Sequence, residues 1–311
     1  MDLTSYKHDL GGGSVLTAYS IDPAIDKKAL EECVEGSLLS RKSKNPADLN
    51  ALSKTMPLVG VYRNFSAMNL RFSFDKYNVP EPLHKHRDAV QLRFSDSIMV
   101  FRNGDISVPA GIIKGEYRDF VATDLKRVPS DLVPDTYPKG KTIAELLPRW
   151  GLSDKAVAKW LATAHFMTPS NGAEFSFVYR GKNLHIAPDC IALSGSTPKF
   201  PDQFNHKSFN VDTYFKDHLI GEMQEEYCLN PDEFEIGKLP FINDTAQIPF
   251  VAVQIKTSAS TEELARKAHN QKQPMKEHSI IFGVDKGGLR KLIEQVDIFP
   301  STARVIDVVS E

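Results

Sequence analysis

The sequence is poor in cysteine and has no long hydrophobic run. Its 311 residues include three cysteines, Cys33, Cys190 and Cys228, which are far apart and form no CxxC pair. An odd number of widely spaced cysteines matches neither a disulfide framework nor a zinc-ligand pattern, so we expect three reduced thiols. No stretch approaches the roughly 20 apolar residues of a membrane span, and the first residues contain no apolar segment of the signal-peptide kind. The sequence therefore predicts a cytoplasmic protein without a membrane partner.

An excess of positive charge is also lacking. The chain has 38 Lys and Arg against 40 Asp and Glu, which gives a formal net charge of −2, and the two signs are interleaved. A protein that binds a nucleic acid polymer usually shows a basic stripe, so we expect no such partner. A small anionic ligand remains compatible with this charge, because a few placed side chains and a metal ion are enough to bind it.

The remaining composition is that of an ordinary soluble globular protein, with 41% hydrophobic and 25% charged residues. The length exceeds the usual size of one compact domain and suggests two. Five turn-forming residues in a row, Thr168-Pro169-Ser170-Asn171-Gly172, give the best boundary. We predict an N-terminal α+β domain of unassigned family over residues 1–168 and a C-terminal α/β domain over residues 173–311.

Hydrophobic periodicity places the elements of the N-terminal half. A helix is predicted within residues 23–39. Short strands are predicted at residues 58–62, 70–74, 89–94 and 98–101. Asn103-Gly104 predicts a hairpin turn. Two further helices are predicted, one at residues 142–147 and one after Ser153, where Val157, Trp160, Leu161 and Ala164 recur on one helical face.

Strands and helices alternate beyond the predicted boundary. Strands are predicted at residues 174–180, 234–241, 248–255 and 278–284, with an extended segment at 184–193 and a loop at 194–210. Helices are predicted at residues 261–269 and 288–296, and a further helix runs from its cap at Asp212 to Tyr227.

Three glutamates share one side of this last helix. Because helical residues advance by about 100° each, Glu222, Glu225 and Glu226 fall within an arc of about 100°. Carboxylates at this spacing repel each other by a few tenths of a kcal/mol per pair, and a divalent cation would reverse the sign of that interaction. Clustered oxygen ligands of this kind suit Mg²⁺ or Mn²⁺. The alternative interpretation is a solvated acidic face.

The order of residues around these glutamates resembles a known motif. The segment Gly221-Glu222-Met223-Gln224-Glu225-Glu226-Tyr227-Cys228-Leu229 resembles the second half of the Nudix box, R-E-U-x-E-E-x-G-U, where U is a large aliphatic residue. Gly221 stands at the position of the box arginine and Cys228 at that of its late glycine. The resemblance covers about residues 173–296. It implies an α/β fold in which the C-terminal domain is a Nudix-like α/β/α sandwich.

The resemblance also implies a function. A Nudix-type enzyme would hydrolyse the pyrophosphate of a nucleoside diphosphate derivative, with Mg²⁺ or Mn²⁺ held by Glu222, Glu225 and Glu226. Glu225 and Glu226 would be the catalytic carboxylates, with Glu277 as a further candidate for the proton acceptor. The second interpretation is a Nudix-fold module that binds a nucleotide without cutting it. It is favoured by Gly221 and by the absence of the upstream glutamate of the box, whose position falls on Thr213.

The loop between Gly195 and Asp212 is the candidate substrate-binding segment. Its phenylalanines precede the glutamate helix, and aromatic faces can stack on a nucleobase. Packing of the loop onto its own domain explains them equally well. The candidate substrate contacts are Gly195, Phe204 and Phe209, with Phe200 nearby and with Arg87, Arg93 and Arg102 as candidate phosphate contacts. The expected partner is a small nucleotide-type ligand, and a homodimer is left open.

Overall fold

The fold is that of a computed structural model. It describes residues 3–43, 56–90, 97–104, 106, 110–124, 141–169, 174–180, 190–202, 209–243, 249–270 and 278–310, with residues 37–43 described in their backbone only. None of the helices in these ranges is long and apolar enough to cross a membrane.

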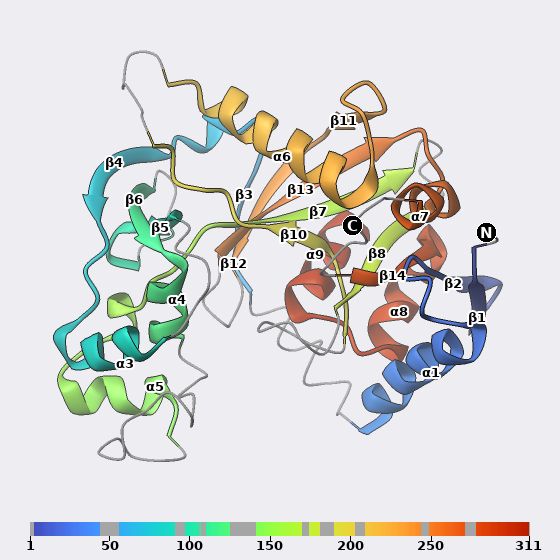
Figure 1. Cartoon of the computed structure of the whole chain (residues 1–311), viewed down its shortest axis with the longest axis horizontal. Coiled ribbons are helices and arrows are strands. Elements are labelled where there is room, and N and C mark those ends of the chain that lie inside the picture. The colour runs from blue at the N-terminus through green and yellow to red at the C-terminus, as the bar shows by residue number, and fades with distance from the viewer. Residues whose placement is uncertain are drawn as a thin grey trace.

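One large mixed sheet runs through the molecule (Figure 1). Its strand order is β1 (Ser5–Gly11), β2 (Ser14–Ser20), β14 (His278–Asp285), β8 (Glu174–Arg180), β7 (Ala162–Pro169), β13 (Pro249–Thr257), β12 (Leu239–Asn243) and β3 (Leu58–Tyr62). The short strands β9 (Cys190–Ala192), β10 (Ser194–Ser196) and β11 (Phe234–Ile236) pair with β8, β7 and β13. β7 and β13 pair in parallel, and the other neighbours along the main order pair antiparallel.

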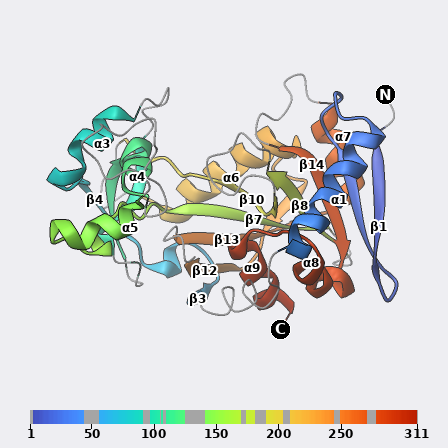
Figure 2. The ribbon, with the colours of Figure 1, turned by 90° about the horizontal axis from the view of Figure 1, so that it is seen from below.

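Helices cover both faces of this sheet. On one face, α6 (Val211–Tyr227) and α7 (Thr261–His269) pack on one hydrophobic cluster, which also contains Val251, Val253 and Ile255 of β13. On the other face, α1 (Lys27–Ser43), α8 (Leu289–Gln295) and α9 (Pro300–Ser310) pack on a second cluster with Phe250 and Ala252 of β13. Alternate residues of one strand thus serve two cores, as expected for a sheet buried on both sides. Figure 2 shows α6 and α9 on opposite sides of β13. The predicted α/β class is confirmed.

The large sheet continues across the predicted domain boundary. β7 precedes residues 170–173 and β8 follows them, yet the two strands are neighbours in the sheet. Strands β1, β2 and β3 of the predicted N-terminal domain pair with each other or with β14 and β12 of the predicted C-terminal domain. The turn-forming residues 168–172 therefore fall between two adjacent strands. The predicted division at this point does not follow the hydrogen bonding of the sheet.

A smaller unit lies at one end of the molecule (Figure 1). It contains a three-stranded sheet of order β4 (Arg71–Lys76), β6 (Gly111–Glu116) and β5 (Ser97–Phe101), with α3 (His84–Ala89), α4 (Tyr117–Thr123) and α5 (Ile143–Leu146) beside it. Backbone bonds from Phe101 to Lys159 and from Leu161 to Met99 tie β5 to the segment that enters β7. The unit is thereby fixed to the central strand of the large sheet.

Sequence predictions about three elements are wrong. Of the strand expected at residues 89–94, Ala89 is the last residue of α3 and Val90 lies in no strand; residues 91–94 fall outside the described part of the chain. The helix expected after Ser153 is a short 3-10 turn, Asp154–Ala156, followed by strand β7, which contains Ala164. β7 is buried on both faces along most of its length, so its apolar residues do not alternate, and the helical spacing that was expected to continue into it comes mainly from residues that precede the strand. The loop expected at residues 194–196 is strand β10.

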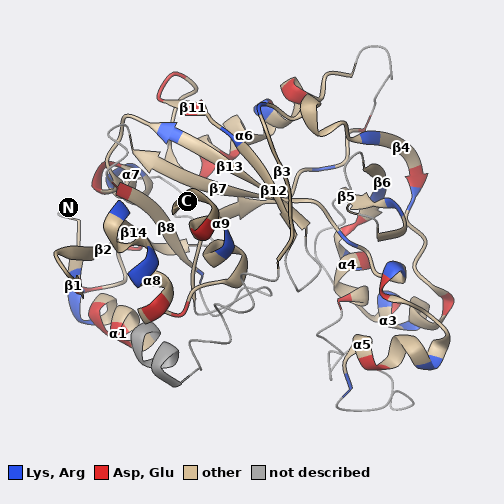
Figure 3. Ribbon diagram, turned by 180° about the vertical axis from the view of Figure 1, so that it is seen from behind, with Lys and Arg blue, Asp and Glu red and all other residues tan. Residues whose placement is uncertain are grey.

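Acidic and basic residues are interspersed over the helices and strands (Figure 3). The arrangement matches the interleaving in the sequence.

Candidate functional site

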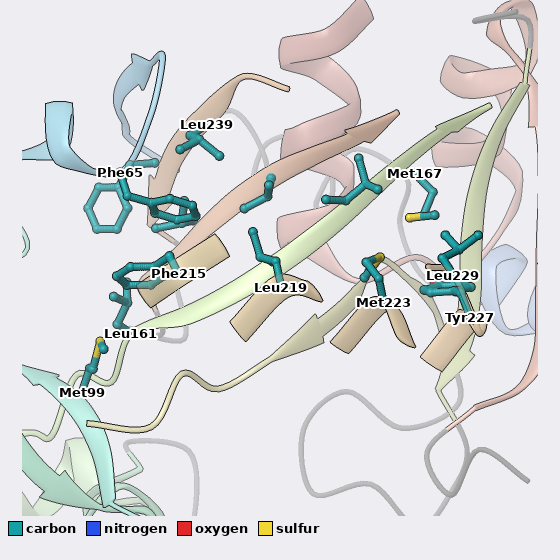
Figure 4. Packing of buried hydrophobic residues seen from close by; sticks show 14 of the residues in the cluster. Phe65, Met99, Leu161, Met167, Phe215, Leu219, Met223, Tyr227, Leu229 and Leu239 are labelled. Atoms are coloured by element: carbon teal, nitrogen blue, oxygen red, sulfur yellow. The ribbon is translucent and has the colours of Figure 1, made fainter. Parts of the chain in front are cut away.

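The helix that carries the three glutamates is built from an apolar stripe. Phe215, Leu219, Met223 and Tyr227 recur every four residues, are buried, and point from α6 towards the large sheet (Figure 4). The helix begins after Asn210, whose side chain accepts a hydrogen bond from the Thr213 N–H at 3.0 Å. Asp212, the expected cap, instead accepts the Ser66 N–H at 3.0 Å. The cap therefore lies two residues earlier than predicted.

Cys228 ends the helix in a left-handed conformation, with φ 51° and ψ 34°. The N–H groups of Cys228 and Leu229 both reach the carbonyl of Met223, as in a helix C-cap that normally uses glycine. The Nudix box has a glycine at this position, and Cys228 adopts the left-handed backbone conformation that glycine favours.

The three glutamates differ in their surroundings. Glu225 is exposed, Glu222 is partly buried, and Glu226 is buried, with only 8% of its surface exposed. The helical arc expected from the sequence therefore places one glutamate in solvent and turns the other two towards the protein.

Glu226 is held by side chains from three strands. The Ser194 hydroxyl of β10 donates to Glu226 Oε2 at 2.5 Å. His165 of β7 places Nδ1 3.9 Å from the same oxygen, and His278 of β14 places Nε2 3.8 Å from Glu226 Oε1. Burial by itself raises the pKa of Glu226, but the neighbouring imidazoles outweigh it and hold the pKa below its usual range. The carboxylate is therefore ionised at neutral pH.

A second group of contacts joins Glu222 to His165 through His218 and Ser196. His218 Nδ1 lies 3.7 Å from Glu222 Oε1, and His218 Nε2 lies 2.8 Å from the Ser196 hydroxyl. Ser196 is also 3.3 Å from His165 Nε2. Burial, and then the proximity of His165, lower the pKa of His218 to about 4, so this ring is neutral at neutral pH. We call the connected set the α6 polar network; it consists of Thr163, His165, Ser194, Ser196, His218, Glu222, Glu226 and His278.

Simple periodicity brings these residues together. His218, Glu222 and Glu226 are spaced by four on α6 and so share one helical face. Thr163 and His165 are alternate residues of β7 and share one face of that strand. β10 runs antiparallel to β7, with Ser194 opposite His165 and Ser196 opposite Thr163. The helical face lies over this pair of strands.

Gly195 has a structural role in the same place. It lies opposite Ala164, and a Cβ atom at Gly195 would stand 2.8 Å from the Thr163 carbonyl oxygen. Glycine thus allows β10 to approach β7 closely and brings both serines within reach of the histidines. The candidate substrate contact predicted at Gly195 is an element of the network's backbone.

The donor atoms fit a divalent cation only in part. Within the described residues no group of three or more His, Cys, Asp or Glu side chains is arranged to hold a metal ion. Glu226 is ionised, however, and no described residue donates a hydrogen bond to its Oε1; both ring nitrogens of buried His278 also lack a hydrogen bond among those residues. Mg²⁺ usually takes one or two carboxylates and completes its shell with water and substrate phosphates. Glu222 and Glu226 offer two carboxylates one helical turn apart on α6.

The other predicted site residues that the structure describes serve packing or pair with carboxylates. Phe204, Arg93 and Glu277 fall outside the described residues. Phe200 is buried, and Phe209 packs edge-on against Phe72 with ring centroids 5.2 Å apart. Arg87 pairs with Asp119 at 2.7 Å, and Arg102 pairs with Asp75 at 2.5 Å. These phenylalanines therefore pack in the core, and both arginines are already paired with carboxylates.

Sequence reasoning missed the histidines and serines of the network. One signal was available, because His218, Glu222 and Glu226 follow a spacing of four along a single helix. His165, Ser194 and His278 gave no comparable signal, since they come together only through the pairing of strands far apart in the chain.

Comparisons with known proteins find no sequence match and a limited structural similarity. No protein-family model matches the chain, and a comparison with curated proteins finds no significant match. Among solved structures, the crystal structure of DR0079 from Deinococcus radiodurans is similar over 49% of this chain and 83% of its own, at 10% sequence identity and a TM-score of 0.35.

Proposed function

We propose that this protein hydrolyses the pyrophosphate of a nucleoside diphosphate derivative, using Mg²⁺ or Mn²⁺ at Glu222, Glu225 and Glu226 of α6. The proposal includes a Nudix-like arrangement of the residues from about 173 onward, as the box resemblance implies. The observation that carries it is Glu226, a buried and ionised carboxylate with one oxygen left without a hydrogen-bond donor among the described residues.

The burial of the charged Glu226 carboxylate requires an energetic explanation. Removing a carboxylate from water costs several kcal/mol unless charged or hydrogen-bonding partners compensate it. Glu226 lies near the C-terminal end of α6, so it caps no helix start, and its partners are one hydroxyl and two imidazoles. Titratable residues in such surroundings concentrate at functional sites. A cation that needs a deprotonated oxygen ligand supplies the missing reason.

The three glutamates would have different tasks. When bound, the cation would neutralise charge that develops on the phosphate oxygens. Glu226 and Glu222 would hold it from the protein side. Glu225, which is exposed on the adjacent side of the helix, is where water and substrate have access, and it would accept the proton of the attacking water.

A nucleotide-binding module without hydrolysis is the second candidate. It is favoured by the two imidazoles and the hydroxyl beside Glu226, because they compensate the buried carboxylate without any metal. Glu225 is also exposed, whereas Glu226 is buried. This candidate needs the same ligand but no product.

A panel of nucleoside diphosphate derivatives, incubated with protein and Mg²⁺ or Mn²⁺, separates the candidates. Wild type should release two phosphate-containing products from at least one compound, and Glu222→Gln and Glu225→Gln should each slow the release at least about tenfold. Glu235→Gln removes an exposed carboxylate from β11 and serves as the control. Binding without products would support the second candidate, and neither binding nor products would exclude both.

A further inference from the structure

The hydroxyl of Ser194 has a fixed role in the network. It lies 2.5 Å from Glu226 Oε2 and 3.0 Å from His165 Nδ1. The hydroxyl donates its single proton to the carboxylate oxygen, so it accepts from the N–H of His165. The direction of both hydrogen bonds is therefore set by the chemistry of the acceptor.

His165 is fixed from its other side as well. Its Nε2 lies 3.2 Å from the Thr163 hydroxyl and 3.3 Å from that of Ser196. The side chain is completely buried. Two strands, β7 and β10, thus hold the imidazole at both nitrogens, and the imidazole holds Ser194.

The two carboxylate oxygens of Glu226 therefore have different surroundings. Oε2 is bound by Ser194, whereas Oε1 faces His278 at 3.8 Å, beyond hydrogen-bond reach. A carboxylate held by one oxygen presents the other in a defined direction. Ser196 extends the arrangement to the second glutamate, because its hydroxyl lies 2.8 Å from His218, the neighbour of Glu222.

We propose that His165 and Ser194 are positioning residues that orient Glu226 so that its Oε1 can bind a divalent cation. This inference rests on the proposed function for the identity of the ligand. Backbone pairing between β7 and β10 already joins the strands. The side-chain bonds therefore affect the direction of the carboxylate more than the fold.

Matched variants separate positioning from stability. Ser194→Ala removes the donor to Glu226. His165→Asn keeps an N–H donor near the position of Nδ1, whereas His165→Leu has almost the same size and no donor. Ser176→Ala removes another buried strand hydroxyl, one that bonds to Thr261 at 2.8 Å outside the network, and serves as the control.

The measurements are calorimetric affinity for Mn²⁺ alone and thermal stability without metal. Ser194→Ala and His165→Leu should bind Mn²⁺ at least about tenfold more weakly than wild type, and His165→Asn should recover most of the loss. Both His165 variants should melt at similar temperatures, and Ser176→Ala should bind Mn²⁺ as wild type does.

Wild-type affinity in Ser194→Ala and His165→Leu would overturn the inference, as would equal losses in the two His165 variants. Absence of Mn²⁺ binding by wild type would overturn it too. Hydrolysis of a panel compound in that case would leave the proposed function standing. Conversely, Mn²⁺ binding that depends on Ser194, without any hydrolysis, would support the inference and reject the enzymatic function.

Discussion

Two buried carboxylates in this molecule, Asp119 and Glu226, are held in different ways. Asp119, in the small unit, is 4% exposed, accepts the Arg87 Nε–H at 2.7 Å and accepts the backbone N–H of Glu116 at 2.9 Å. With Glu116 it forms the capping box at the start of α4. Glu226 in the large unit has a hydroxyl donor and two imidazoles, and it caps nothing.

The difference separates a structural carboxylate from a candidate functional one. Arginine is permanently charged and the capping N–H is fixed in the backbone, so the partners of Asp119 fully account for its burial. Histidine carries no permanent charge and is a common metal ligand, so the surroundings of Glu226 also suit a bound cation. Loss of Asp119 should therefore affect the fold, and loss of Glu226 should affect ligands.

The largest expected effect is that of Asp119→Ala on stability. The variant leaves the Glu116 N–H without its acceptor and Arg87 without its closest partner. Breaking a buried charge pair costs about 3 to 5 kcal/mol, and Arg87 keeps Glu116 and Asp88 at 3.6 Å, so we expect about 3 kcal/mol in the free energy of unfolding. Urea unfolding measures it, with exposed Asp88→Ala as the control. A loss below 1 kcal/mol would show that the capping box is not what anchors α4.

Glu226→Gln should change stability little and hydrolysis strongly. The amide has the same shape and can still accept the Ser194 hydroxyl, so the free energy of unfolding should change by about 1 kcal/mol or less. A neutral amide is a poor cation ligand, and hydrolysis of the panel substrate should fall at least about 100-fold, or about 2.7 kcal/mol. Asp119→Asn is the matched isosteric variant. Destabilisation of Glu226→Gln comparable to that of Asp119→Ala would make Glu226 a structural residue.

The pH dependence of stability should report on His218. Its pKa in the folded protein, about 4, lies below the 6.5 of a free histidine. Below pH 6.5 the unfolded chain takes up a proton that the folded protein does not, so the stability associated with neutral His218 is complete above pH 6.5 and is lost as the pH falls. The loss between pH 6.5 and about 4.5 should be roughly 2 kcal/mol. His218→Gln should remove this part of the slope in urea unfolding, and parallel curves for the two proteins would contradict the assignment.

The sequence was sufficient for elements with a strong local pattern. α7 was predicted at its observed bounds, and the structure shows a local signal for its start, since Ser260 caps it and Glu263 completes a capping box. α6 was predicted with its observed end at Tyr227, although its cap is Asn210 and not Asp212, two residues earlier than expected. β7 was not predicted, because a strand buried on both faces has no alternation and Val157, Trp160 and Leu161 happen to follow a helical spacing.

The candidate site could be predicted only where it is local. The glutamates and His218 lie on one helix, so their shared face follows from the helical repeat. The partners of Glu226 depend on a register that no local pattern contains, since Ser194 pairs with His165 across 29 residues and β14 enters the sheet from the far end of the chain. The sequence therefore indicated that the glutamates share one helical face, but not that imidazoles hold one of them.

The smallest expected effect tests whether the network already does what an arginine at position 221 would do. Gly221 is an exposed residue inside α6, and a Cβ atom there would meet nothing within 4 Å. Gly221→Ala should therefore raise the free energy of unfolding by about 0.5 to 1 kcal/mol, because glycine is a poor helix former. Gly221→Arg should gain about the same, with a few tenths of a kcal/mol more from Asp217 and Glu225, which lie four residues away on either side. Urea unfolding measures both gains.

We expect equal turnover for the two variants, because Ser194 and His165 already fix Glu226. Faster turnover in the arginine variant than in the alanine variant would show that Ser194 and His165 do not fully orient the glutamates. A guanidinium at position 221 would then supply the missing orientation.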